Sequence, residues 1–172
     1  MASKIVYFSS PLSENPTMPM RRFNVREALA KQGFWVFDPT LAWDVSSHSD
    51  AYASGIEHRI QEVNRYILLN SVDAVLGLII EGVPSHTPLE LKAASHHDVP
   101  VAVLVDGFPH GLPDAVSESS WQTFRAEEEN EAAAWLAAHT DTSPAPKRDV
   151  TQHGYEPEPE CLEQVGKWLL RR

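Results

Sequence analysis

The chain has 172 residues, of which 42% are hydrophobic and 22% charged, and its formal net charge at pH 7 is −10. These values predict one soluble globular domain with a full core. The acidic balance argues against polymeric DNA or RNA and against anionic membrane surfaces, although a few donors suffice to hold one phosphate. The longest apolar run, residues 74–80, is too short to span a bilayer, and the first residues show no signal-peptide pattern. A single cysteine, Cys161, excludes an internal disulfide, so we expect a cytoplasmic protein.

Strands and helices alternate along the chain. Short apolar runs bounded by breakers predict strands at residues 4–9, 34–37, 75–80, 99–105 and 121–124. Apolar residues at helical spacing predict helices at residues 20–32, 55–70 and 126–139, with a further helix beginning at Thr87. In the first helix we expect Phe23, Ala28 and Leu29 to form the apolar face. The alternation predicts a doubly wound, five-stranded parallel sheet with helices on both faces, flavodoxin-like in order.

Two segments do not fit this alternation. Residues 40–54 carry Trp43, His48 and Tyr52 without clean periodicity, so they form either a lid over a site or a surface excursion that packs its own aromatics. Residues 140–159 are rich in Pro, Thr and Asp and predict an extended tether, followed by a short helix at 161–170. We therefore divide the chain into an α/β domain, residues 1–139, and a C-terminal segment, residues 140–172.

The segment 72–106 predicts a strand, a loop, a helix and a second strand. A right-handed crossover places the start of the helix beside the carboxyl ends of the strands, where open α/β sheets bind ligands. Ser85, His86, Thr87 and Glu90 therefore belong to a candidate site. Glu90 is open to two interpretations. It is either the far half of a capping box that begins at Thr87, or an ionised carboxylate directed at a ligand and able to act as a nucleophile toward a sugar carbon.

Other residues should converge on the same edge of the sheet. The loops after the first and second strands place Ser9, Ser10, Pro11 and Asp38 at this edge. Tyr7 has a plain interpretation as part of the core, because alternate positions of a buried strand face a helix layer.

The stretches KIVYFSSP, VDAVLGLI, HTPLELKAA and VPVAVLV resemble the nucleoside 2-deoxyribosyltransferases and the related 2'-deoxynucleoside 5'-monophosphate N-glycosidases, over roughly residues 4–139. The resemblance implies that Glu90 is the nucleophile that takes up the deoxyribosyl group and that Tyr7 lies near it. It implies contacts to sugar or phosphate from two segments. These are the backbone after the first strand (Ser9, Ser10, Pro11) and the loop before the helix (Ser85, His86, Thr87). It also implies a homodimer or higher homo-oligomer, in which Ser119 and Ser120 reach a 5'-phosphate of a neighbour; otherwise both are solvated loop hydroxyls.

The chain departs from this family at three places. His86 and Lys92 stand where the family has glycines. Where the family has a helix aspartate, eight residues before Asp73, this chain has Arg65 beside Asn64. Arg65 either holds a phosphate or substrate carbonyl or pairs with Glu62 on a solvated helix face. Glu62 and Glu81 are the nearest spare carboxylates. Asp73 itself opens a strand about 20 Å from the site, so we expect a structural role for it.

We therefore expect an enzyme that cleaves or transfers the N-glycosidic bond of a nucleoside or nucleoside 5'-monophosphate by a retaining route. Glu90 would attack, Tyr7 would orient it, and His86, Asn64 or Arg65 would handle the leaving base. The histidines form no metal-ligand spacing, and we expect neither a metal nor a cofactor. The alternatives are a nucleotide-binding protein that has lost the chemistry, and an oligomerising scaffold with an acidic interaction tail.

Overall fold

The computed structural model describes residues 4–12, 15–42, 57–83, 85–114 and 116–140. Most of the aromatic loop (residues 43–54), the first residues of the second predicted helix, the tether after Thr140 and the closing helix lie outside these ranges. The proposed division at residue 139 therefore stays a prediction.

Within these ranges, five parallel strands form one sheet in the order β2-β1-β3-β4-β5. The strands are β1 (Ile5–Ser9), β2 (Trp35–Phe37), β3 (Ala74–Ile80), β4 (Val101–Asp106) and β5 (Gln122–Arg125). This is the predicted doubly wound, flavodoxin-like arrangement, and it is confirmed. At the entrance of β3, Asp73 accepts a hydrogen bond of 2.7 Å from the backbone N–H of Ile5 through its Oδ2. Its structural role at the start of the strand is thereby confirmed.

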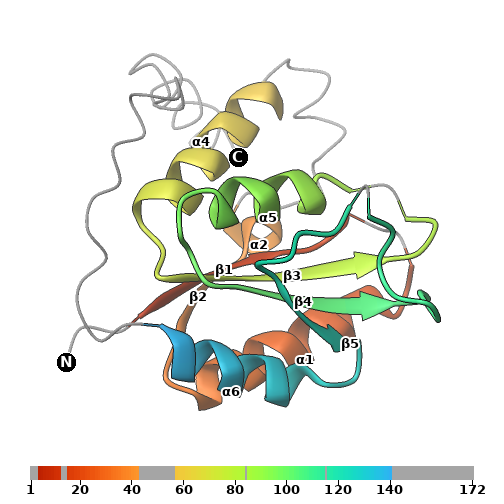
Figure 1. Ribbon diagram of the computed structural model, residues 1–172. Coiled ribbons are helices and arrows are strands. Elements are labelled where there is room, and N and C mark those ends of the chain that lie inside the picture. Colours follow the sequence, from red (N-terminus) through yellow and green to blue (C-terminus); the bar gives the residue numbers. More distant parts are fainter. Residues whose placement is uncertain (1–3, 13–14, 43–56, 84, 115, 141–172) are drawn as a thin grey trace.

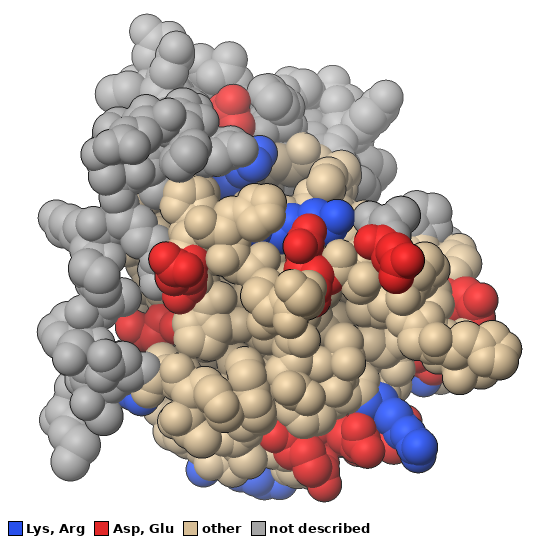
Figure 2. All heavy atoms as spheres, viewed as in Figure 1, with Lys and Arg blue, Asp and Glu red and all other residues tan. Residues whose placement is uncertain are grey.

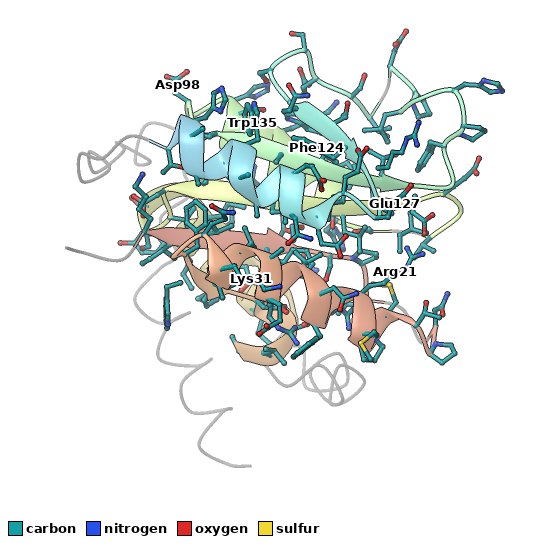
Figure 3. All side chains as sticks on the ribbon, turned by 90° about the horizontal axis from the view of Figure 1, so that it is seen from below. Arg21, Lys31, Asp98, Phe124, Glu127 and Trp135 are labelled. Atoms are coloured by element: carbon teal, nitrogen blue, oxygen red, sulfur yellow. The ribbon has the colours of Figure 1, made fainter. Side chains whose placement is uncertain are left out.

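Helices cover both faces of the sheet (Figure 1). The helices α4 (Glu57–Asn70) and α5 (Thr87–Ser95) lie on one face, and α1 (Met18–Lys31) and α6 (Glu129–His139) lie side by side on the other (Figures 1 and 3). A one-turn helix, α2 (Pro39–Ala42), follows β2. Figure 3 places Arg21 at the end of α1 nearest the carboxyl ends of the strands, with Lys31 at the other end.

The core consists of two layers, because successive strand side chains point to opposite faces of a sheet. Val6 and Phe8 pack toward α1 and α6, whereas Tyr7 packs toward α4 and α5. Ser9, two residues after Tyr7, shares its face and is buried. The strand alternation therefore directs the only two polar side chains among residues 5–9 toward α5.

The predicted apolar face of the first helix is wrong at Phe23, which is 51% exposed. The helix begins at Met18, two residues earlier than predicted, and its buried side chains are Met18, Val25, Ala28 and Leu29. Phe23 lies two residues from Val25, which is about 200° around the helix and on the opposite side. Helix α6 begins at Glu129, later than the predicted residue 126.

Candidate active site

The side chain of Glu90 is held by two hydroxyl groups of β1. The phenol of Tyr7 donates a hydrogen bond of 2.8 Å to Oε1, and the hydroxyl of Ser9 donates one of 2.5 Å to Oε2. Of the two interpretations of Glu90, the capping box that begins at Thr87 is wrong. His86 is the N-cap of α5 and makes no side-chain cap bond, and Thr87 is already the first helical residue. Glu90 therefore reaches across to the strand at the carboxyl edge of the sheet.

Burial dominates the acid–base behaviour of this pair. It raises the pKa of the Glu90 carboxyl, and the hydrogen bonds from Ser9 and Tyr7 partly offset that rise. The positive charges of His86 and Arg65 lower the pKa of Glu90 further. Burial, and after it the charge of Glu90, raises the pKa of Tyr7 well above its usual value. Tyr7 is therefore a lasting hydrogen-bond donor to a carboxylate that its neighbours help to ionise.

Two of the predicted helix and loop residues, His86 and Arg65, lie close enough to this carboxylate for their charges to act on it. His86 is exposed immediately before α5, one turn before Glu90. Arg65, on α4, is exposed and close enough for its charge to act on Glu90. Asn64, beside it, is buried. Two helices on the same face of the sheet, through the start of α5 and the middle of α4, thus act on Glu90.

The loop after β1 is fixed by an arginine that the sequence interpretation missed. Arg22, on α1, donates through Nε to Ser10 Oγ at 3.1 Å and through Nη2 to the carbonyl of Pro11 at 2.5 Å. Burial lowers the pKa of Arg22, and neighbouring Arg26 lowers it further while Asp38 opposes both. The one available signal was the spacing of Arg22 and Arg26, which puts both on one side of the helix.

Asp38 belongs to the same edge, but its oxygens are already engaged. Oδ2 accepts a hydrogen bond of 2.8 Å from Arg26, and Oδ1 accepts bonds from the backbone N–H and the hydroxyl of Thr40. Its side chain is 1% exposed. These contacts explain Asp38 as the residue that ties the turn after β2 to α1, and its predicted contact with substrate stays a prediction.

Ser119 and Ser120 are separated from Glu90 within one chain. Both are exposed and precede β5, whose first residue is Gln122. Because all five strands are parallel, residues before a strand lie at the amino edge of the sheet, opposite the carboxyl edge that carries Glu90. The predicted contact of these serines with a 5'-phosphate across a subunit interface stays a prediction.

Gly77 is a second residue that the sequence interpretation missed. A Cβ atom at this position of β3 would lie 2.6 Å from Cδ1 of Leu91, which is fully buried on α5. Gly77 also pairs in register with Ser9. The close approach of helix and sheet therefore depends on this strand glycine. Lys92, where the resembling family has a glycine, instead lies 3.4 Å from Glu118 in a partly exposed ion pair.

Among the described residues, no group of three or more His, Cys, Asp or Glu side chains is placed to hold a metal ion. None of the helices in those same ranges combines the length and the apolar character needed to cross a membrane.

No family model matches the chain, and no curated protein matches it. Among solved structures, its fold is similar to that of a 2-deoxyribosyltransferase from the psychrotolerant bacterium Bacillus psychrosaccharolyticus. The TM-score is 0.49 and the sequence identity 15%, and the match covers 73% of this chain and 90% of that chain. A similarity of this size concerns the course of the backbone and carries no information about activity.

Proposed function

We propose that the protein cleaves or transfers the N-glycosidic bond of a nucleoside or nucleoside 5'-monophosphate, with Glu90 as the nucleophile. The observation that carries this proposal is the position of the Glu90 carboxylate. It lies near the start of α5, at the carboxyl edge of an open parallel sheet, with each oxygen bonded to a hydroxyl of β1. A carboxylate that serves only as a helix cap would bond to its own backbone instead.

The proposed reaction has two steps. An oxygen of Glu90 forms a bond to the anomeric carbon of the sugar, while the bond to the base breaks and its electron pair leaves with the base. Water, or the nitrogen of a second base, then displaces Glu90 from the glycosyl-enzyme and gives its proton to a general base. The first acceptor makes the protein a hydrolase and the second makes it a transferase. Tyr7 orients Glu90 throughout, because its raised pKa keeps the phenol protonated.

The departing base needs a proton or a hydrogen-bond donor. His86 stands one turn from Glu90 and is exposed, so we assign it the role of proton donor. Arg65 and Asn64, on α4, would bind the base or a carbonyl group on it. Ser10, Pro11, Ser85 and Thr87 belong to the loops that would contact the sugar or phosphate.

The substrate is a small molecule. With a net charge of −10, the protein repels a polymeric nucleic-acid backbone. On the face drawn in Figure 2, the described Lys and Arg side chains lie in small groups beside Asp and Glu, without a broad basic surface. A homo-oligomer would add Ser119 and Ser120 of a neighbouring subunit to the site, where they would bind a 5'-phosphate.

The test is release of free base from a panel of deoxynucleosides and their 5'-monophosphates. We expect wild-type protein to release base and Glu90→Gln to lose at least roughly a thousandfold in rate, since the nucleophile is gone. The control is Glu118→Gln, which alters a glutamate paired with Lys92 at the surface. Normal turnover by Glu90→Gln would refute the proposed nucleophile.

A second function, nucleotide binding without turnover, is favoured by one observation. Asn64 and Arg65 stand where the resemblance implies an aspartate, and neither is a carboxylate. Thermal-shift measurements with the same panel distinguish the two functions. Stabilisation by a nucleotide from which no base is ever released would favour the binding protein.

A further inference from the structure

A row of hydroxyl groups connects the start of α5 with the carboxylate of Glu90. The backbone N–H of Thr87 donates to Ser85 Oγ at 2.9 Å. Ser85 Oγ lies 2.7 Å from Thr87 Oγ1, which lies 3.0 Å from Ser9 Oγ. Ser9 Oγ lies 2.5 Å from Glu90 Oε2. Four consecutive hydrogen bonds therefore lead from a backbone amide to the proposed nucleophile.

The direction of these bonds follows from the number of protons. Each hydroxyl carries one proton, and an ionised carboxylate only accepts. Ser9 must therefore give its proton to Glu90, and the proton between Ser9 and Thr87 must come from Thr87. By the same rule, Ser85 donates to Thr87 and the amide donates to Ser85. Every donor in the row points toward the carboxylate.

The two hydroxyls of this row that lie closest to Glu90 are buried. Ser9 is 2% exposed and Thr87 is 1% exposed, and no buried side-chain polar atom among the described residues lacks a hydrogen-bond partner. The proton of Ser9 is already used on Glu90. The Ser9 hydroxyl is therefore better placed to bond to Glu90 than to a ligand.

We propose that Ser9 is a positioning residue for Glu90, supported by Thr87 and Ser85, and that it orients the carboxylate and keeps it ionised without contacting the substrate. The catalytic part of this inference rests on the proposed function, whereas the hydrogen-bonded row does not. With Tyr7 on Oε1 and Ser9 on Oε2, two donors fix the plane of the carboxylate. Aligned hydrogen bonds strengthen one another, and this row begins at the positive end of a helix.

Other groups also act on this carboxylate, so the test must separate them. Tyr7 from β1, His86 from the start of α5 and Arg65 from α4 all lower the pKa of Glu90, and Asp38, after β2, acts on Tyr7. All of them are retained when Ser9 or Thr87 alone is changed. A difference from wild type at the same pH then reports the hydroxyl row.

The experiment measures the pKa of the Glu90 carboxyl directly, by carbon-13 NMR of glutamate-labelled full-length protein, with Glu90→Gln identifying the signal. Ser9→Ala should raise this pKa by about one pH unit, because a hydrogen bond to a charged group is lost. Thr87→Val keeps the shape of the side chain but removes its hydroxyl, and it should raise the pKa by less. Thr87→Ser, which keeps the hydroxyl, should restore the wild-type value.

The matched control is Ser95→Ala at the far end of the same helix. Ser95 bonds to the carbonyls of Leu91 and Lys92 and accepts from Trp121, with no link to the row. The Ser95→Ala variant should leave the pKa of Glu90 unchanged.

In the base-release assay, Ser9→Ala should shift the acidic limb of the kcat/KM profile to higher pH by the same amount. It should also lower kcat about tenfold with little change in KM.

An unchanged Glu90 pKa in folded Ser9→Ala would overturn the inference. A raised KM with unchanged kcat would also overturn it, because Ser9 would then be a substrate contact. Failure of the proposed function looks different. In that case wild-type protein releases no base from any nucleoside, while the NMR measurement still decides whether Ser9 holds Glu90 ionised.

Discussion

The phenol of Tyr7 and Oε1 of Glu90 are joined by a hydrogen bond of 2.8 Å, although 83 positions of sequence separate the two residues. The bond acts on both partners. It favours the ionised form of Glu90 and the protonated form of Tyr7, and burial raises the pKa of each. The pair therefore consists of a phenol that stays protonated as a hydrogen-bond donor and a carboxyl group with a raised pKa.

Tyr7→Phe removes the donor and keeps the ring, which packs against Phe37 with the ring centroids 5.7 Å apart. We expect the pKa of Glu90 to rise further and kcat to fall roughly 10- to 100-fold, the equivalent of a hydrogen bond to a charged group. The acidic limb of the pH–rate profile should shift to higher pH. Tyr66→Phe, which removes a phenol from α4, is the control and should leave the limb in place. A Tyr7→Phe profile equal to that of wild type would contradict the assigned role.

The raised pKa of Glu90 also makes a prediction for stability. In the folded protein this carboxyl holds its proton more tightly than in the unfolded chain, so folding is favoured when the group is protonated. The stabilisation of the fold by this protonated carboxyl is fully present at pH values below the pKa of the unfolded chain, near 4.5. It is lost as the pH rises through the higher pKa of the folded protein. Urea unfolding of wild type and Glu90→Gln across this range should therefore show wild type losing stability relative to the variant. A difference that does not change with pH would contradict the raised pKa.

The sequence allowed the sheet order and the location of Glu90 to be predicted, because both depend on strand patterns and on the crossover rule. The direction of the Glu90 side chain was not predictable. A threonine followed three residues later by a glutamate fits a capping box and a site equally well, and the choice depends on two hydroxyls more than 80 positions away.

Three other features were hidden for similar reasons. Phe23 is exposed because α1 buries the side that carries Val25, and Phe23 lies about 200° around the helix from it. Arg22 has the same sequence context as any solvated helix arginine until the loop after β1 folds against it. Gly77 is important only through what packs above it, and a strand glycine carries no such information by itself.

Substitution of Asp38 tests whether this buried carboxylate, at the carboxyl edge of the sheet, is structural or binds substrate. Asp38→Asn keeps an acceptor for Thr40 but removes the charge that faces Arg26. We expect the free energy of unfolding to fall by about 1–3 kcal/mol, because the arginine, only 25% exposed, loses its charged partner. Denaturant unfolding measures this, and Asp114→Asn in an exposed loop is the control. Unchanged stability together with a raised KM would instead support a contact with substrate.

Gly77→Ala tests how closely α5 must approach the sheet. The new methyl group would meet Cδ1 and Cδ2 of Leu91 at 2.6 and 2.7 Å, beside the register pair of Gly77 and Ser9. We expect a loss of roughly 1–3 kcal/mol of stability from overpacking. The rate of base release should also fall, because Glu90 precedes Leu91 on α5 and moves with it. Leu91→Ala creates space for the methyl group, so the double variant should lose less stability than the sum of the two single changes. Strict additivity would mean that Gly77 and Leu91 do not set the spacing between Ser9 and Glu90.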